Sequence, residues 1–190
     1  TARVLPALLG LLILAGCSSP VKVESDYTPE IDFSAFKTYS WYQTALRDPR
    51  SLAYLGGDIF DKRVRYNIDA QLQAKGFILK NDGPVDFMVN YDVLTQDRQD
   101  IHTYNTYGGM APGFGYRGYY GYGGMGTTTT QVVNYKQGQL IVDVLLPDAT
   151  LVWRGTAEGR VPKNEKPEKR EQGTRDLIAK ILENFPPTPE

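Results

Sequence analysis

The amino-acid sequence predicts an α+β fold, with a single antiparallel sheet, two helices packed on one face, and a long hairpin that carries a Gly/Tyr-rich loop. Three observations predict it. Several segments alternate apolar and polar residues, as half-buried strands do. Two others repeat apolar residues at the spacing of an amphipathic helix. Successive strand segments are joined by short connections, which require antiparallel pairing.

The first sixteen residues, 1–16, predict a signal peptide. Behind Arg3 lies an uncharged run of twelve residues, 4–15. That run is too short for a membrane span of about 20 residues, and it suits the apolar region of a signal peptide, about 7 to 15 residues. It ends in Leu-Ala-Gly-Cys, which resembles the bacterial lipoprotein signal. We therefore expect Cys17 to be acylated; the alternative is a secreted protein with an unpaired cysteine.

Acylation of Cys17 attaches the protein to a membrane. Cys17 is the only cysteine, so the chain forms no internal disulfide. Ser18 after it resembles the sorting pattern for the outer membrane rather than the inner membrane, with the domain facing the periplasm. Residues 17–20 are then the acylated cysteine and a short tether, which reaches about 10–14 Å when extended. We expect the domain to sit close to the membrane surface.

The remaining chain, 21–190, is predicted to be one domain. Strands are predicted at 21–27, 37–42, 77–80, 86–93, 127–135, 140–146 and 151–155. A loop is predicted at 43–57 and a solvated stretch at 162–173. The first helix takes Asp58 as its cap and ends near Gly76, and the second stops before Pro186. Their apolar stripes are Phe60, Val64, Ile68 and Leu72 in the first helix, and Leu177, Ile178, Ile181 and Leu182 in the second.

A long hairpin extends this sheet. After Val93 the strand pattern continues with polar residues on both faces, through 96–100, and its simplest antiparallel partner is 127–135. The outer end of this hairpin carries too little apolar surface to be buried. A Gly/Tyr-rich loop insertion at 104–126 separates the two strands, and Gly138 is predicted in the turn after the second.

The Gly/Tyr-rich loop contains two matches to the dinucleotide-binding pattern G-x-G-x-x-G, at 113–118 and 121–126. A dinucleotide site needs a helix directly after the glycines, whereas four threonines follow here. We therefore expect no cofactor. The aromatic side chains of the loop predict contacts to a partner instead, and a low-complexity insertion without a role is the alternative. The predicted partner-binding residues are Tyr116, Arg117, Tyr119, Tyr120 and Tyr122.

The charge balance, 21 basic and 22 acidic residues, argues against a nucleic-acid partner. Arg117 is the only charge among the loop tyrosines, too little for binding to a polyanion. The sole histidine, His102, could join Asp97 and Asp100, but zinc needs three or four ligands that include His or Cys. We therefore predict no metal site.

Catalytic chemistry has little support in the sequence. There is no G-x-S-x-G motif and no spare cysteine, so a nucleophilic triad is not expected. A pair of carboxylates for glycoside hydrolysis has no fixed spacing, and Asp86, Asp92 and Asp143 lie on predicted strands. An envelope glycan hydrolase therefore stays an alternative to a protein that is not an enzyme.

Several segments resemble bacterial envelope lipoproteins of the domain of unknown function family 4136. The resembling segments are DYTPEIDFSAFKTYSWY at 26–42, KGF at 75–77, VDFMVNYDV at 85–93, GQLIVDVLLPDATLVWRGTA at 138–157 and ILENFPP at 181–187. The resemblance implies a small lipid-anchored α+β domain with a glycine-rich insertion and with no catalytic residues to transfer. It also implies that Trp41, Tyr91, Trp153 and Arg154 determine the fold rather than a site.

We therefore expect a non-enzymatic outer-membrane lipoprotein that binds an envelope protein or polymer through the loop and the polar hairpin. A purely structural lipoprotein with an idle loop is a further alternative.

Overall fold

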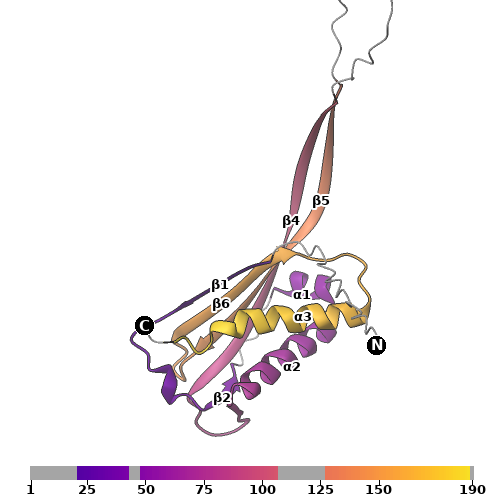
Figure 1. The fold of residues 1–190 in the computed structure, drawn as a ribbon. Coiled ribbons are helices and arrows are strands. Elements are labelled where there is room, and N and C mark those ends of the chain that lie inside the picture. Colours follow the sequence, from indigo (N-terminus) through magenta and orange to yellow (C-terminus); the bar gives the residue numbers. More distant parts are fainter. Residues whose placement is uncertain (1–20, 43–47, 107–126, 189–190) are drawn as a thin grey trace, which may run out of the picture.

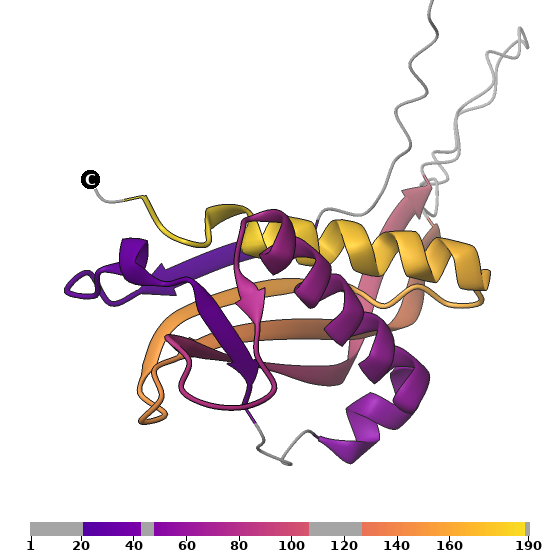
Figure 2. The same cartoon turned by 90° about the horizontal axis from the view of Figure 1, so that it is seen from below.

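A computed structural model describes residues 21–42, 48–106 and 127–188. These residues form one six-stranded sheet with helices on one face (Figure 1, Figure 2). The strands are β1 (Lys22–Tyr27), β2 (Thr38–Trp41), β3 (Ile78–Leu79), β4 (Phe87–Thr106), β5 (Thr127–Leu145) and β6 (Leu151–Arg160). The helices are α1 (Pro49–Leu55), α2 (Asp58–Ala74) and α3 (Pro167–Ile181), with short 3₁₀ turns at Phe33–Ala35 and Leu182–Asn184. The α+β class is as the sequence predicts.

The sheet is mixed, so the prediction of a wholly antiparallel sheet is wrong. The strand order is β1-β6-β5-β4-β2-β3. The first four strands pair antiparallel, whereas β2 pairs parallel with both β3 and β4. The reason is the connection: α1 and α2 carry the chain from the end of β2 back to the start of β3, and such a crossover permits parallel pairing.

The helices differ from the prediction at their beginnings. α1 lies in the predicted loop 43–57, and its start is stabilised by Asp48, whose carboxylate accepts hydrogen bonds from the backbone N–H groups of Arg50 and Ser51. α2 has Gly57 as its N-cap, so Asp58 is its first residue rather than its cap. α3 begins at Pro167, inside the stretch predicted as solvated, because proline suits the first turn of a helix.

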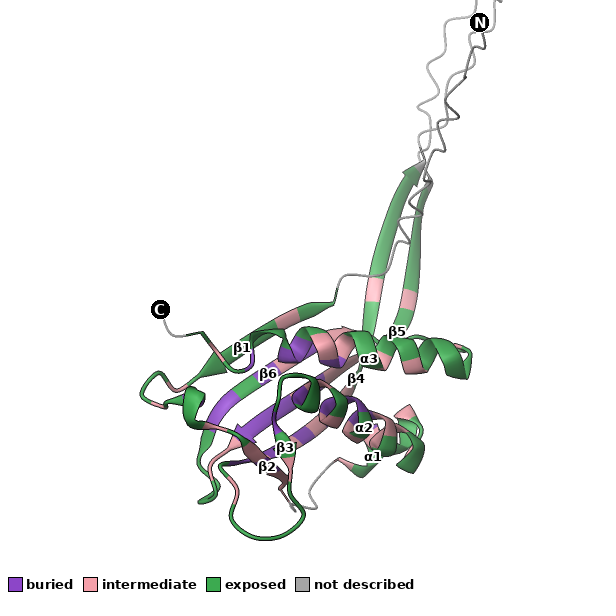
Figure 3. Cartoon of the chain, turned by 60° about the horizontal axis from the view of Figure 1, so that its bottom comes forward, coloured by how far each residue is buried: buried purple, intermediate pink, exposed green. Residues whose placement is uncertain are grey.

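The core lies between the helices and one face of the sheet (Figure 3). Both predicted helix stripes face it, with Phe60 and Leu177 only partly buried. An aromatic cluster closes the end of the sheet away from α1, where the rings of Phe87, Phe185 and Trp153 pack together. Among the described residues, none of the helices is long and apolar enough to cross a membrane.

Gly155 on β6 lets α3 approach the sheet. A Cβ atom at this position would lie against the Trp153 ring and only 2.7 Å from Cγ2 of Ile181 on α3. The absence of a side chain at position 155 therefore sets both the position of the Trp153 ring and the distance between α3 and the strand. Gly173, within α3, has open space around its Cα.

We expect Gly155→Ala and Gly173→Ala to change stability in opposite directions. Overpacking at position 155 should lower the free energy of unfolding by about 1–3 kcal/mol. The alanine at exposed helix position 173 should raise it by about 0.5–1 kcal/mol, since Ala is the better helix former. Urea denaturation monitored by circular dichroism measures both. Equal effects of the two substitutions would contradict the close packing of α3 on Gly155.

Candidate functional site

The most distinctive feature of the molecule is a two-stranded ribbon that leaves the body (Figure 1). β4 and β5 pair without interruption from Met88–Leu145 to Thr106–Thr127. β6 ends opposite Gln137, so the pair continues beyond it alone. We call residues 97–106 and 127–136 the distal ribbon. At about 3.3 Å per residue, its ten residues per strand extend roughly 33 Å from the body.

The prediction of a long antiparallel hairpin with an unburied outer end is therefore confirmed (Figure 3). Two details differ. Tyr104, placed in the loop by the sequence, belongs to β4, and Gly138 lies inside β5 rather than in a turn. A Cβ atom at Gly138 would lie 2.8 Å from Cγ2 of Val161. The glycine is needed for this close approach of the chain after β6.

Side chains of the distal ribbon are largely exposed. Ile101 and Val132 stand directly opposite each other on one face, and 66% of Ile101 and 50% of Val132 remain accessible to solvent. The other face carries Tyr104 and His102, whose rings are stacked with centroids 6.3 Å apart. The ribbon thus presents aliphatic and aromatic groups that its own chain does not cover.

One side of the ribbon base is held by α1. The hydroxyl of Ser51, which is almost fully buried, accepts a hydrogen bond of 2.8 Å from the backbone N–H of Thr95. The same hydroxyl donates to the Asp48 carboxylate at 2.6 Å, which holds the pKa of Asp48 below its usual range. Lys136 pairs with Asp97 at 2.8 Å and lies 4.7 Å from the ring centre of Tyr54 on α1.

The other side of the base is held by the end of β6. The Arg160 guanidinium forms an ion pair with Asp100 and lies 4.0 Å from the ring centre of Tyr135. The backbone N–H of Val161 then donates to the Lys136 carbonyl at 2.9 Å. The ribbon therefore leaves the body from a base that is fixed on both sides.

The residues weighed for a metal site are engaged elsewhere. Asp97 and Asp100 each pair with a different cation at the ribbon base. Within the described ranges, no group of three His, Cys, Asp or Glu side chains is arranged to hold a metal ion. Asp100 and Asp97 instead fix the ribbon base.

The fold separates Asp86 from the other two aspartates weighed for hydrolysis. Asp86 accepts hydrogen bonds from the backbone N–H groups of Lys37 and Thr38, and these bonds lower its pKa. Asp143 is buried on the helix-free face and receives two hydrogen bonds from Arg154, at 2.7 and 2.9 Å. Asp92 lies on that same face, on neighbouring β4. Only Asp92 and Asp143 are brought near each other.

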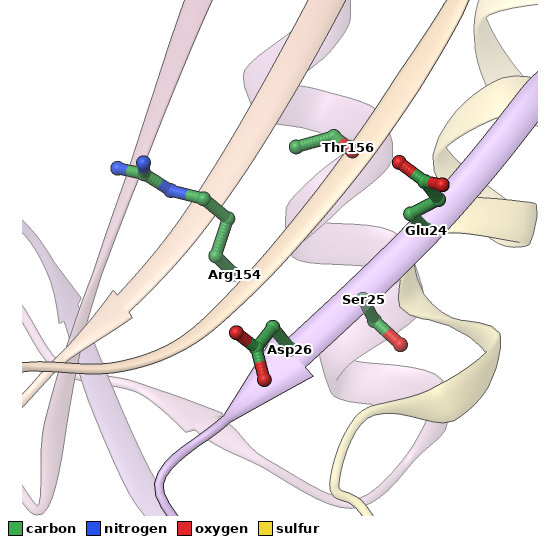
Figure 4. Close-up of a pocket in the computed structure, with 5 residues that line it drawn as sticks. All are labelled: Glu24, Ser25, Asp26, Arg154 and Thr156. Atoms are coloured by element: carbon green, nitrogen blue, oxygen red, sulfur yellow. The ribbon is translucent and has the colours of Figure 1, made fainter.

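The helix-free face has an open depression of about 480 Å³ between β6 and β1. Figure 4 shows its lining, with Glu24 and Asp26 from β1 and with the Arg154 guanidinium turned away toward β5. That orientation follows from the pairing with Asp143, which raises the pKa of Arg154. The depression is thus lined by the carboxylates of Glu24 and Asp26, while the guanidinium of Arg154 is paired with Asp143 instead.

A second polar layer lies between α2 and the sheet. Asp69 accepts hydrogen bonds from the Tyr39 hydroxyl at 2.7 Å and from the Trp41 indole at 3.1 Å, and Asp61 accepts one from Tyr91. Burial raises the pKa of Asp69 above its usual range. Trp41, Tyr91 and the buried Trp153 thus pack within the fold. The sequence predicted no role for Asp61 or Asp69.

The other residues predicted as sites lie outside the described ranges. These are the acylation residue Cys17 and the partner-binding residues Tyr116, Arg117, Tyr119, Tyr120 and Tyr122. Residues 107–126 of the predicted loop lie outside them as well.

The fold and site define an α+β domain from which a β-ribbon protrudes. The chain belongs to the family described as "Domain of unknown function (DUF4136)", whose sequence model matches residues 23–187. No curated protein matches the sequence significantly. A solved structure, a PDZ domain protein from Parabacteroides distasonis ATCC 8503, is similar in fold, with a TM-score of 0.52 and 12% sequence identity. The similarity covers 88% of this chain but only 36% of that one.

We expect Ser51→Ala to destabilise the ribbon base. The substitution removes the acceptor of the Thr95 N–H and the donor to Asp48, so the free energy of unfolding should fall by about 1–3 kcal/mol. Ser25→Ala, at an exposed position on β1, is the matched control and should change it by less than about 0.5 kcal/mol. Denaturant titrations of the two variants compare them directly, and an unchanged Ser51→Ala variant would refute the role of Ser51.

The raised pKa of Asp69 predicts a pH-dependent effect of Asp69→Asn. The asparagine retains an oxygen that accepts from Tyr39 but carries no charge. In the wild type, the stability linked to this carboxyl is complete below its ordinary pKa, about 3.9, and is lost as the pH rises through the higher folded-state pKa. The stability of the variant relative to the wild type should therefore increase from about pH 4 upward and then level off. A difference that stays constant from pH 3 to 8 would contradict the shift.

Proposed function

We propose that this protein is a non-enzymatic, lipid-anchored envelope lipoprotein that binds or scaffolds an envelope protein or polymer. The observation that carries the proposal is the distal ribbon, which leaves the body with exposed side chains from a base fixed on both sides. A two-stranded hairpin is marginally stable on its own. Contacts from α1 and from Arg160 hold the base of this one where it leaves the sheet.

The sequence adds the anchor and the compartment to this proposal. Cys17 ends a lipoprotein-like signal, and Ser18 favours the outer membrane, with the domain facing the periplasm. Several acyl chains give stable attachment where one chain gives only marginal binding. The Gly/Tyr-rich loop predicted at 104–126 supplies the proposed partner contacts Tyr116, Arg117, Tyr119, Tyr120 and Tyr122.

The geometry of the body supports an orientation in which the ribbon lies near the membrane. Lys22, at the start of β1, lies opposite Glu158, which lies opposite Gln139, three residues along β5 from Lys136 at the base of the ribbon. The start of β1 and the base of the ribbon therefore lie at the same end of the sheet. Five residues from Cys17 to Lys22 span at most about 18 Å, shorter than the distal ribbon. An acylated chain then carries its ribbon close to the membrane surface.

Hydrolysis of an envelope glycan is the second candidate function. Asp92 and Asp143 share the helix-free face, which favours it, but Asp143 is held in a two-hydrogen-bond pair with Arg154. A general acid or nucleophile has to be free to exchange protons or to attack the sugar. The binding function therefore has the stronger support. Release of soluble sugar from cell-wall material that Asp92→Asn and Asp143→Asn both abolish would favour the hydrolase instead.

Photo-crosslinking in living cells tests the binding function. A photoreactive amino acid at Tyr104 on the ribbon should capture one reproducible envelope component, because that side chain is exposed. The same amino acid at Tyr66, which is exposed on α2, is the matched control and should capture none. Mass spectrometry identifies the products, and a second probe at Tyr119 reports on the loop. Identical random products from Tyr104 and Tyr66 would overturn the proposal.

A further inference from the structure

Most edges of the sheet are protected against pairing with another strand. Charged residues and short length are the usual protection of an exposed edge. The outer edge strand β1 carries Lys22, Glu24 and Asp26, and the opposite edge strand β3 has only two residues. In the distal ribbon, the β4 edge carries Asp97, Arg98 and Asp100.

The edge of β5 in the distal ribbon differs from the others. Beyond Lys136 at the base, its nine residues from Thr127 to Tyr135 read TTTTQVVNY, without a charge, a proline or a glycine. β-Branched residues, which favour strands, make up most of this segment. Long, uncharged strands of this composition are the ones that pair with further strands. Among the edge strands that the structure describes, residues 127–135 are the long segment without a charged side chain.

The backbone of this edge has hydrogen-bonding groups that point outward. The Lys136 carbonyl accepts from Val161 on the β6 side, so the other even-numbered residues of β5 present their N–H and C=O groups on that side as well. They are Thr128, Thr130, Val132 and Asn134. The Asn134 carbonyl accepts a hydrogen bond of 3.4 Å from Nζ of the exposed Lys163, and this bond has to break before a further strand can pair there.

We propose that the β5 edge of the distal ribbon pairs antiparallel with the same edge of a second copy of this chain, with the two-fold axis at Val132. This inference rests on the proposed binding function, since it names a second copy as a partner of the ribbon. A symmetric dimer uses the same patch on both subunits, and antiparallel pairing of one strand with its own copy satisfies that condition. The result is a four-stranded ribbon with the charged β4 edges outside.

The position of the axis follows from the side chains. Because Ile101 lies opposite Val132, an axis at Val132 aligns four aliphatic side chains on one face, two from each copy. An axis at Gln131 would align polar side chains instead. Around Val132, Thr130 would face Asn134 of the second copy, and no two like charges would meet. The exposed surfaces of Ile101 and Val132 become the centre of an apolar row.

The arrangement is compatible with two membrane anchors. A two-fold axis between antiparallel strands stands perpendicular to the ribbon, so both copies keep the same face of the ribbon toward the same side. With that axis along the membrane normal, the four-stranded ribbon lies along the surface and both tethers reach the same leaflet. Confinement to one surface also raises the effective concentration of the two copies.

Disulfide trapping of the full-length chain tests the dimer. The variants keep Cys17, because its acylation anchors the chain and leaves the introduced cysteine as the only free thiol. In the proposed pairing, the two Val132 Cα atoms are about 5.5 Å apart, within the range that a disulfide bridges. Val132→Cys should therefore give roughly tenfold more oxidised dimer than Gln99→Cys. Gln99 is the control because it lies on the same face of the ribbon but on β4, away from the proposed contact. Adding Thr130→Lys beside the axis should lower the trapped fraction.

Each result has a defined meaning. Equal trapping at positions 132 and 99, or none at position 132 in a chain whose unfolding transition is unchanged, overturns the β5–β5 pairing. Such a result together with capture of a different envelope protein from Tyr104 leaves the binding function standing. Failure of both the trapping and the Tyr104 capture removes the dimer and the binding function together. Capture only of lipid by the Tyr104 probe means that the ribbon contacts the membrane rather than a second copy.

Discussion

The continuous pairing of β4 with β5 is the constraint on which the rest of the structure depends. Its inner half buries Val89 and Tyr91 of β4 and Val142 and Val144 of β5 under the helices. A slip of one residue in either strand would turn the buried side chains of that strand to the helix-free face. Burial of the inner half therefore also fixes the register of the exposed half, where no core exists to do so. The pairing of Ile101 with Val132 is set by the hydrophobic core.

The base of the ribbon shows how a body without a second sheet can support such an extension. Ser51 and Arg160 come from elements far apart in the sequence and contact opposite edges of the same two strands. Each makes a polar contact to β4 beyond Val93, the last core residue of that strand. The partly exposed ion pair to Asp100 contributes little stability by itself. Its effect is to fix the direction in which the strands leave.

Much of the fold is predictable because the spacing of apolar residues along each element shows which of its sides faces the core. The alternation in 86–93 and the four-residue spacing in α2 both report burial, and both elements form as predicted. The direction of β2 is not encoded in its own residues; it follows from the helical crossover after it. Gly138 resembles a turn residue in sequence, but its role is contact with Val161, which no local pattern contains.

The same limit applies to the candidate site. The polar outer hairpin was predictable, because loss of the apolar alternation shows directly that a strand has left the core. Ser51 and Arg160 were not, since a serine in a short helix and an arginine at a strand end have no distinctive spacing. Their importance arises only when the ribbon passes between them. The hydrophobic core fixes the position of the distal ribbon but does not cover its side chains. The function of the ribbon therefore depends on the surface of the partner that binds it.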